Sequence, residues 1–171
     1  MEGTYFNGQS FSHSESHTYT LENGRIVKDE EKQTYNGNSS SSITETFSYD
    51  ANNYLSSISS KGSNIESKTK IITWSDGNLI KLGDRTFTYS NYPWAKAFPL
   101  YLDGSNMDAC LFSIGYYGNN PKNLPSKTYT SETSGATYDY TLEGYYVTKV
   151  VISPLIETNK NHKAISTILW E

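Results

Sequence analysis

One β-hairpin pattern occurs four times in the chain, and this repeat restricts the possible folds more than any other feature. The clearest copy runs from Ile71 to Leu82, where apolar residues alternate with polar ones on both sides of Asp76-Gly77. Such alternation is typical of a half-buried strand, and glycine accepts the positive φ that a tight hairpin turn requires. Three further copies lie at residues 19–26, 47–55 and 138–147. The repeat predicts successive antiparallel hairpins.

Alternating segments between these copies extend the pattern to nine or more antiparallel strands. Tyr, Phe, Trp and Leu gather on one face of them, and Thr, Ser and Lys gather on the other. We expect strands of about six or seven residues, a loop at residues 35–42, and a bulge or early strand end where Leu55 and Ile58 stand three apart. The predicted fold is all-β, an antiparallel up-and-down meander that forms a soluble barrel or a strongly coiled open sheet. Its aromatic face points inward.

Residues 91–125 interrupt this pattern. Pro93 and Pro99 exclude their segment from a central strand, because proline cannot donate a hydrogen bond to a neighbouring strand. We interpret the segment as an aromatic loop, and it is the best candidate for ligand binding. Its aromatic side chains could stack on a sugar ring, cover an apolar cavity, or fold back as core cover. The candidate ligand-binding residues are Tyr92, Trp94, Phe98 and Tyr101.

One short helix is expected after this loop, near residues 106–117. Apolar residues fall there at the spacing of one helical face, with Asn106 placed to cap the helix and Gly118 placed to end it. We expect this face to plug the interior or to close one end of the sheet. The residues of the face are Met107, Cys110, Leu111 and Ile114.

Composition limits the possible partners. A net charge of −4 gives no electrostatic footprint for nucleic acid, and no apolar run reaches the ~20 residues of a membrane-spanning helix. A chain of 171 residues fits a single domain, predicted to span residues 1–171. Cys110 is the only cysteine, which excludes an internal disulfide.

Candidate chemistry is sparse, and we predict no catalytic residues, no metal site and no cofactor. His13 and His17 would point to one face of a strand, but residues i and i+4 lie about 13 Å apart there, too far to share one ion. We interpret this stretch as a solvated polar face. The acids at the repeated turns, Glu22, Asp50, Asp76 and Glu143, are explained by turn chemistry. A glycosidase would need two carboxylates facing each other in a cleft, which leaves Asp84, Asp103, Asp108 and Asp139 as candidates.

The stretch from Leu111 to Ser126, together with residues 138–149, resembles a family of gut-bacterial domains of unknown function with a porin-like fold. The hairpins before it are similar to that family and, more loosely, to the tyrosine-aspartate repeats of large secreted shell proteins. The resemblance covers most of residues 15–153. It implies an exported protein of the periplasm or cell surface, often lipid-anchored. Here such an anchor would lie on a segment that this chain does not contain.

Three hypotheses about function follow. The first is an exported, non-enzymatic β-barrel module that binds a glycan, a peptide or another protein of the cell envelope. The second is a carrier of a small apolar ligand inside the barrel, which needs an internal cavity of a few hundred Å³. The third, an enzyme that hydrolyses glycans, needs a cleft with facing acids.

Overall fold

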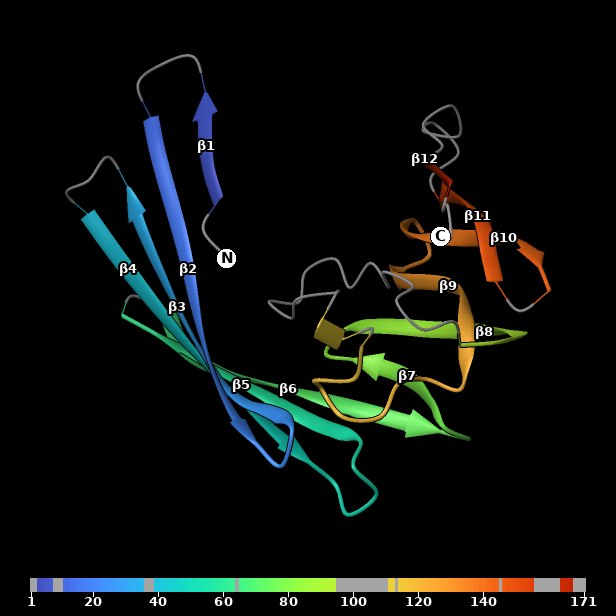
Figure 1. The fold of residues 1–171 in the computed structure, drawn as a ribbon, viewed down its shortest axis with the longest axis horizontal. Helices are drawn as coiled ribbons and strands as arrows, with labels where there is room; N and C mark the ends of the chain where they lie inside the picture. The colour runs from blue at the N-terminus through green and yellow to red at the C-terminus, as the bar shows by residue number, and fades with distance from the viewer. Residues whose placement is uncertain are drawn as a thin grey trace. The chain divides into compact units, whose positions relative to one another are not determined.

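The structure is a computed structural model that describes residues 3–7, 11–35, 39–63, 65–94, 111–112, 114–144, 146–155 and 164–167. These residues form twelve strands, and each pairs antiparallel with the next, so that β1 and β12 are the two ends of the strand order (Figure 1). The strands are β1 (Gly3–Asn7), β2 (Phe11–Glu22), β3 (Arg25–Tyr35), β4 (Ser39–Tyr49), β5 (Leu55–Gly62), β6 (Ile65–Ser75), β7 (Asn78–Leu82), β8 (Arg85–Pro93), β9 (Asn123–Ser131), β10 (Ser134–Glu143), β11 (Tyr146–Pro154) and β12 (Ala164–Thr167). The all-β antiparallel meander is confirmed. Of the two predicted forms, the structure has the open sheet.

Several strands are longer than predicted. β2 has 12 residues and β3, β4 and β6 have 11 each, so the expectation of about six or seven is wrong. Part of the predicted loop at residues 35–42 is strand, because Ser39 pairs with Tyr35 and Ser42 pairs with Lys32. A run of serines shows no hydrophobic alternation, yet its backbone donates and accepts hydrogen bonds like that of any strand.

The hairpin turns have the predicted conformation. Asn23 and Gly24 have φ values of 51° and 77°, and Asp76 and Gly77 have values of 50° and 77°. Two successive positive φ angles define the type I′ turn, whose twist matches that of the paired strands. Asp50 closes a longer turn, where its Oδ1 accepts hydrogen bonds from two backbone N–H groups.

All four repeated hairpins carry a bulge at the same place on the returning strand. The pairing shifts by one residue after Thr20, Ser48, Thr73 and Thr141, which leaves Val27, Ser56, Ile80 and Thr148 as the extra residues. The bulge expected between Leu55 and Ile58 is therefore confirmed. The residue preceding each bulge is an apolar side chain exposed by 1% or less: Ile26, Leu55, Leu79 and Val147. Bulges increase local twist, so the repeat gives every hairpin the same strongly twisted start.

The chain folds into two compact units, residues 1–71 with 116–118 and residues 72–115 with 119–171. In the first unit, strands β2 to β5 lie side by side (Figure 1). The segment Tyr116–Gly118 packs on them. Tyr116 accepts a backbone hydrogen bond of 2.8 Å from Ile26, and the buried Tyr117 ring lies 5.1 Å from that of Phe47. This segment belongs to the stretch that carries the family resemblance.

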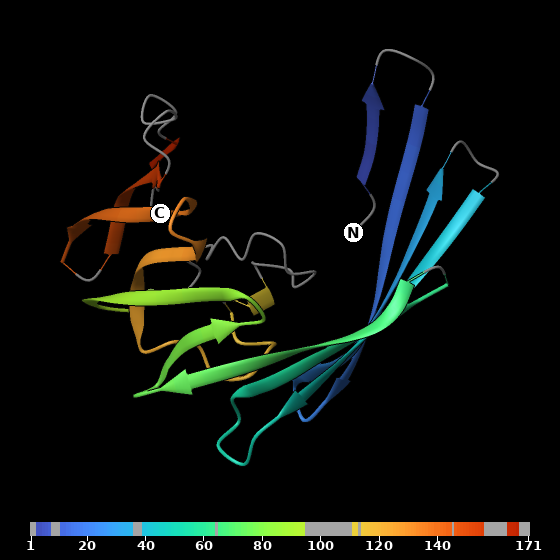
Figure 2. The same cartoon turned by 180° about the vertical axis from the view of Figure 1, so that it is seen from behind.

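The second unit contains strands β7 to β11, which Figure 2 shows from behind. Its core includes Leu124, Tyr138, Val147 and Val150. Buried tyrosines tie its strands together, since the Tyr140 hydroxyl donates a 2.6 Å hydrogen bond to the backbone oxygen of Pro125. In both units the described residues of the apolar face predicted to point inward are mostly buried or half-buried, but Leu21 is 48% exposed.

The helix expected near residues 106–117 differs from the prediction. Leu111 and Phe112 are helical, residues 114–117 form a turn, and Met107 and Cys110 lie outside the described residues. Phe112 is buried while Ile114 is 58% exposed, so the predicted apolar face is wrong at Ile114. The turn rotates Ile114 away because Gly115, with φ of 92°, ends the helical conformation and donates its N–H to Phe112.

Candidate functional site

A groove lies on the first unit, lined by strands β4, β5 and β6. Its volume is about 590 Å³, and eight of its eleven lining residues are serine or threonine. Alternation along the strands places Thr46 and Ser59 on the face opposite Phe47. We call it the hydroxyl groove. Its lining residues are Ser42, Thr44, Thr46, Ser59, Ser60, Lys61, Gly62, Ser63, Ser67, Lys68 and Thr69.

Hydroxyl groups of this groove stand in a row across the strands. Thr46 pairs with Ser59, and Ser59 pairs with Thr69, so these three side chains form one row. The Ser59 and Thr69 hydroxyls are 3.0 Å apart, and Thr46 donates to the backbone oxygen of Ser59. The row is thus held in place by its own hydrogen bonds before any ligand binds.

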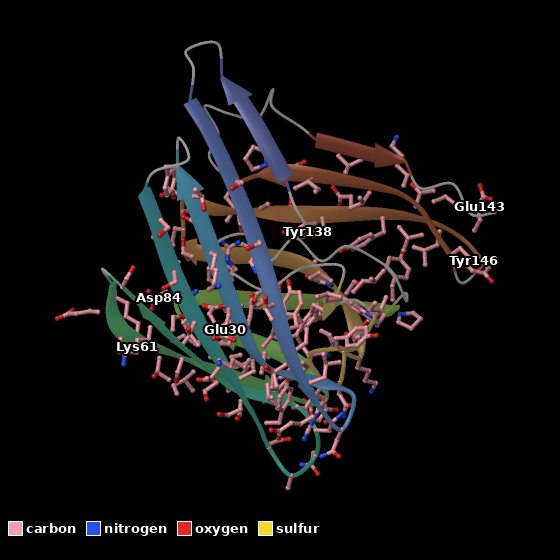
Figure 3. All side chains as sticks on the ribbon, turned by 60° about the vertical axis from the view of Figure 1, so that its left-hand side comes forward. Glu30, Lys61, Asp84, Tyr138, Glu143 and Tyr146 are labelled. Carbon is pink, nitrogen blue, oxygen red and sulfur yellow. The ribbon has the colours of Figure 1, made fainter. Side chains whose placement is uncertain are left out.

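The groove is locally cationic in an acidic chain. Its lining includes Lys61 and Lys68, and it contains no Asp or Glu, although the whole chain carries a net charge of −4. Lys61 is labelled in Figure 3 on β5. Ammonium and hydroxyl groups together donate hydrogen bonds to anionic or polyhydroxylated ligands.

The opposite face of the first unit carries a group of titratable side chains around His17, which we call the histidine cluster: Glu15, His17, Asp29 and Glu31. The Nδ1 atom of His17 lies 2.8 Å from Oδ2 of Asp29, and its Nε2 atom lies 2.9 Å from Oε1 of Glu15. Glu15, His17 and Glu31 each present a ligand atom within 4.8 Å of the others. Gln33 donates a hydrogen bond to Glu31, and Tyr35 donates one to Gln33. The polar residues therefore continue along β3 on the same face.

Burial changes the proton affinity of these groups. It raises the pKa of Asp29 above its ordinary value, and the hydrogen bond from His17 opposes this effect without cancelling it. Burial alone would lower the pKa of His17, but the carboxylates of Glu15 and Asp29 outweigh it and raise that pKa. Burial likewise raises the pKa of Glu45, against a hydrogen bond from Ser60 and the charge of Lys70. The cluster places the carboxyl groups of Glu15, Asp29 and Glu31 around one imidazole at low exposure.

The interpretation of the His13 to His17 stretch as a solvated face is wrong for His17 and its partners. Asp29 and Glu31 are buried and Glu15 and His17 are half-buried. Sequence analysis missed Asp29, Glu31 and Glu45, although one signal was present. Glu45 alternates in phase with Phe47, so it had to share the apolar face.

The predicted aromatic residues are placed differently from one another. Tyr92 is 45% exposed, whereas Trp94 is half-buried and packs on the core of the second unit. The Trp94 ring meets Phe112 edge to face at 6.3 Å, and its backbone N–H donates to Lys122. Phe98 and Tyr101 lie outside the described residues. The aromatic ligand site stays a prediction.

The acids considered for hydrolysis are not brought together in the part of the chain that the structure describes. Asp84 lies in the turn between β7 and β8 and Asp139 lies on β10, and both are exposed. Asp103 and Asp108 fall outside the described residues. Among the residues described, no helical segment has the length and hydrophobicity that crossing a bilayer requires.

Comparison with known proteins agrees with this fold. The family model described as "Domain of unknown function (DUF4595) with porin-like fold" matches residues 5–150. A porin-like protein from Bacteroides uniformis ATCC 8492 is similar in structure, with a TM-score of 0.62 and 20% identity over 97% of this chain and 74% of its own. A porin-like protein from Bacteroides vulgatus ATCC 8482 has a TM-score of 0.48 and 11% identity over 98% of this chain and 70% of its own. The chain matches no curated protein sequence.

Proposed function

The chain belongs to the DUF4595 family of domains of unknown function with a porin-like fold, and from this premise we propose that it is an exported, non-enzymatic module of the bacterial cell envelope that binds an anionic glycan. The hydroxyl groove is the binding surface. The observation that carries the proposal is the lining itself, which combines eight serine and threonine residues with two lysines and no acid.

The size and chemistry of the groove suit a short stretch of polysaccharide. Its volume of about 590 Å³ lies within the range of known ligand sites, about 300–1,000 Å³. The ordered row of Thr46, Ser59 and Thr69 offers hydroxyl groups to sugar hydroxyls, and Lys61, on the same face as Ser59, offers charge to uronic acid or sulfate groups. Because the hydroxyls are already fixed by hydrogen bonds, little side-chain entropy is lost on binding.

Binding of the whole chain to polygalacturonate, with neutral dextran as the comparison, tests this function. We expect polygalacturonate to bind and its affinity to fall as salt is raised, since exposed charges are screened. The substitution Lys61→Gln should lower the affinity about tenfold, by loss of one charge-assisted hydrogen bond. Thr69→Val, which removes one hydroxyl at nearly constant shape, should weaken binding less.

The matched control is Lys81→Gln, which removes the same charge from an exposed position on β7 outside the groove. Its affinity should equal that of the unmodified chain. Failure to bind polygalacturonate, or an equal loss of affinity in Lys61→Gln and Lys81→Gln, would overturn the proposal. If Tyr92→Ala loses binding while the groove variants still bind, the binding site is the aromatic loop of Tyr92, Trp94, Phe98 and Tyr101 and not the hydroxyl groove.

A further inference from the structure

The four repeated hairpins reveal that Asp29 occupies a position built for an apolar side chain. In each repeated hairpin, a buried apolar residue precedes the bulge. The residue three positions further along is also buried and apolar in the other three hairpins: Ile58, Leu82 and Val150. The first hairpin has Asp29 there, 2% exposed. Burial of a carboxylate in place of an aliphatic side chain is costly unless a partner compensates for the charge. Burial of Asp29 therefore costs folding free energy that the apolar residues at the equivalent positions of the other hairpins do not cost.

The compensation available from the described residues is incomplete. Oδ2 of Asp29 is paired with Nδ1 of His17, but Oδ1 is buried and has no hydrogen-bond partner among the residues described. A single imidazole faces the carboxylates of Glu15, Asp29 and Glu31. If all three were ionised, one protonated histidine would leave the cluster with a net negative charge. Such a site favours a further cation.

The orientation of His17 shows where that cation would bind. In the metal-free chain Nδ1 of His17 donates to Asp29 and Nε2 donates to Glu15, so loss of the Nε2 proton leaves a lone pair directed toward Glu15. A histidine that binds a metal through one ring nitrogen usually donates a hydrogen bond from the other nitrogen to a carboxylate. Asp29 is the carboxylate that would have this role for His17. We propose that Glu15, His17 and Glu31 bind a divalent transition-metal ion, with Asp29 as the positioning residue.

The donor set indicates the kind of ion. Zn²⁺ accepts both imidazole nitrogen and carboxylate oxygen as ligands, and three protein ligands leave its fourth position open. Ca²⁺ and Mg²⁺ prefer sites made of oxygen ligands alone. On binding, the ion displaces the proton from Nε2 of His17 to solvent, and it neutralises the charge of the two glutamates. The ligand atoms lie within 4.8 Å of one another, so side-chain rotation on β2 and β3 suffices to close the site.

The histidine cluster and the hydroxyl groove lie on opposite faces of the first unit, so this site is independent of the proposed glycan binding. Zn²⁺ binding to the full chain, freed of metal with a chelator, is measured by calorimetry, and Co²⁺ serves as a spectroscopic probe. We expect one Zn²⁺ per chain and visible Co²⁺ absorption bands typical of a four-coordinate site. Thermal unfolding should shift upward as Zn²⁺ is added, because the ion binds the folded state.

Three substitutions and one matched control separate a metal site from a structural ion pair. His17→Gln and Glu31→Gln should each weaken Zn²⁺ binding more than tenfold, and Asp29→Asn should weaken it about 10–100-fold through the orientation of His17. Glu30→Gln, the neighbouring residue on the opposite face of β3, should bind Zn²⁺ unchanged. Figure 3 labels Glu30, whose side chain pairs with Lys28 at 2.9 Å.

Far-UV circular dichroism of each metal-free variant checks that it is folded. Glu31→Gln removes a buried charge at nearly constant shape, whereas Asp29→Asn also removes the charged partner of His17 and is compared only if its spectrum matches that of the unmodified chain. The proposal is overturned if the unmodified chain binds neither Zn²⁺ nor Co²⁺. It is equally overturned if the folded Glu31→Gln variant binds Zn²⁺ as tightly as Glu30→Gln does.

Discussion

Tyr49 joins the turns of the first unit to its apolar core. Its hydroxyl donates a 2.6 Å hydrogen bond to the backbone oxygen of Ile26, and Arg25 lies 4.5 Å from its ring centroid. Burial raises the pKa of Tyr49 to about 12, and the charge of Arg25 opposes this only in part. The phenol must therefore be neutral for this arrangement to persist.

Tyr49 predicts a loss of stability in alkaline solution. Since its pKa is about 12 in the folded chain and 10 when unperturbed, its contribution is complete below pH 10 and is lost as the pH rises through 12. This contribution is at most roughly 2–3 kcal/mol. In Tyr49→Phe, urea unfolding between pH 10 and 12 should show a shallower decline, whereas Tyr146→Phe, at an exposed position, should decline like the unmodified chain. An equal decline in Tyr49→Phe would contradict the prediction.

Gly118 is a glycine of the first unit where a side chain should be strongly destabilising. Its φ is +84°, and a Cβ there would collide with the backbone oxygen of Asn53 and stand 3.1 Å from the Tyr49 ring. Gly144 has a φ of +63° and open space around it, so Gly144→Ala suffers only the conformational penalty of about 1–2 kcal/mol. Gly118→Ala should cost at least about 2 kcal/mol more in urea unfolding. An equal loss of unfolding free energy in the two variants would contradict the prediction and would show that the Tyr116–Gly118 segment moves aside to accommodate the added methyl group.

At the residue scale, sequence reasoning failed where a charge shares an apolar face. Alternation located Phe47 and Tyr49 correctly, and the same alternation puts Glu45 beside them. Asp29 was not identifiable in this way, because its burial depends on the bulge at Val27, which changes the face of every later residue of β3. The bulge in the first hairpin can be recognised only by comparing its strand register with the registers of the other three hairpins.

The hairpin is the element that sequence predicts best in this protein. Asn23-Gly24 and Asp76-Gly77 specify their turns locally, by the positive φ angles that those residues accept. Strand lengths were underestimated because the far ends of β3 and β4 pair serine with polar residues, without any hydrophobic pattern. Backbone pairing there follows from the neighbouring strand and not from the residues themselves.

The turn between β6 and β7 is tied to the start of β9 by a side-chain clamp. Oδ1 of Asn78 accepts the backbone N–H of Asn123 at 2.9 Å, its Nδ2 donates to Asn123 Oδ1 at 3.1 Å, and Gly77 accepts from Lys122. Asn78→Ala should cost roughly 1–3 kcal/mol, since it leaves polar groups of Asn123 unpaired. Tryptophan fluorescence during urea unfolding measures this through Trp74 in the same hairpin. Asn91→Ala, at an exposed position at the end of β8, should stay within about 0.5 kcal/mol of the unmodified chain.

At the scale of the whole molecule, the division of the sequence into two compact units falls within one strand. Their division falls between Ile71 and Ile72 of β6, and the strand order is unbroken from β1 to β12. Residues 65–71 of β6 pair with β5 and residues 72–75 pair with β7, so local unfolding of either half of β6 removes hydrogen bonds from one neighbouring strand. Organisation as one domain, residues 1–171, stays a prediction.

The distribution of tryptophan makes this prediction testable. The first unit contains no tryptophan, whereas Trp74 and Trp94 belong to the second, so fluorescence reports the unfolding of the second unit.

Leu55 and Leu79 hold equivalent positions in two of the repeated hairpins, each 1% exposed, one in each unit. Truncation of either to alanine should cost about 2–5 kcal/mol. If the chain is one domain, Leu55→Ala must lower the urea midpoint of tryptophan fluorescence as far as Leu79→Ala does, and circular dichroism must give the same midpoint. A fluorescence midpoint that moves in Leu79→Ala and stays fixed in Leu55→Ala would mean that the two units unfold independently.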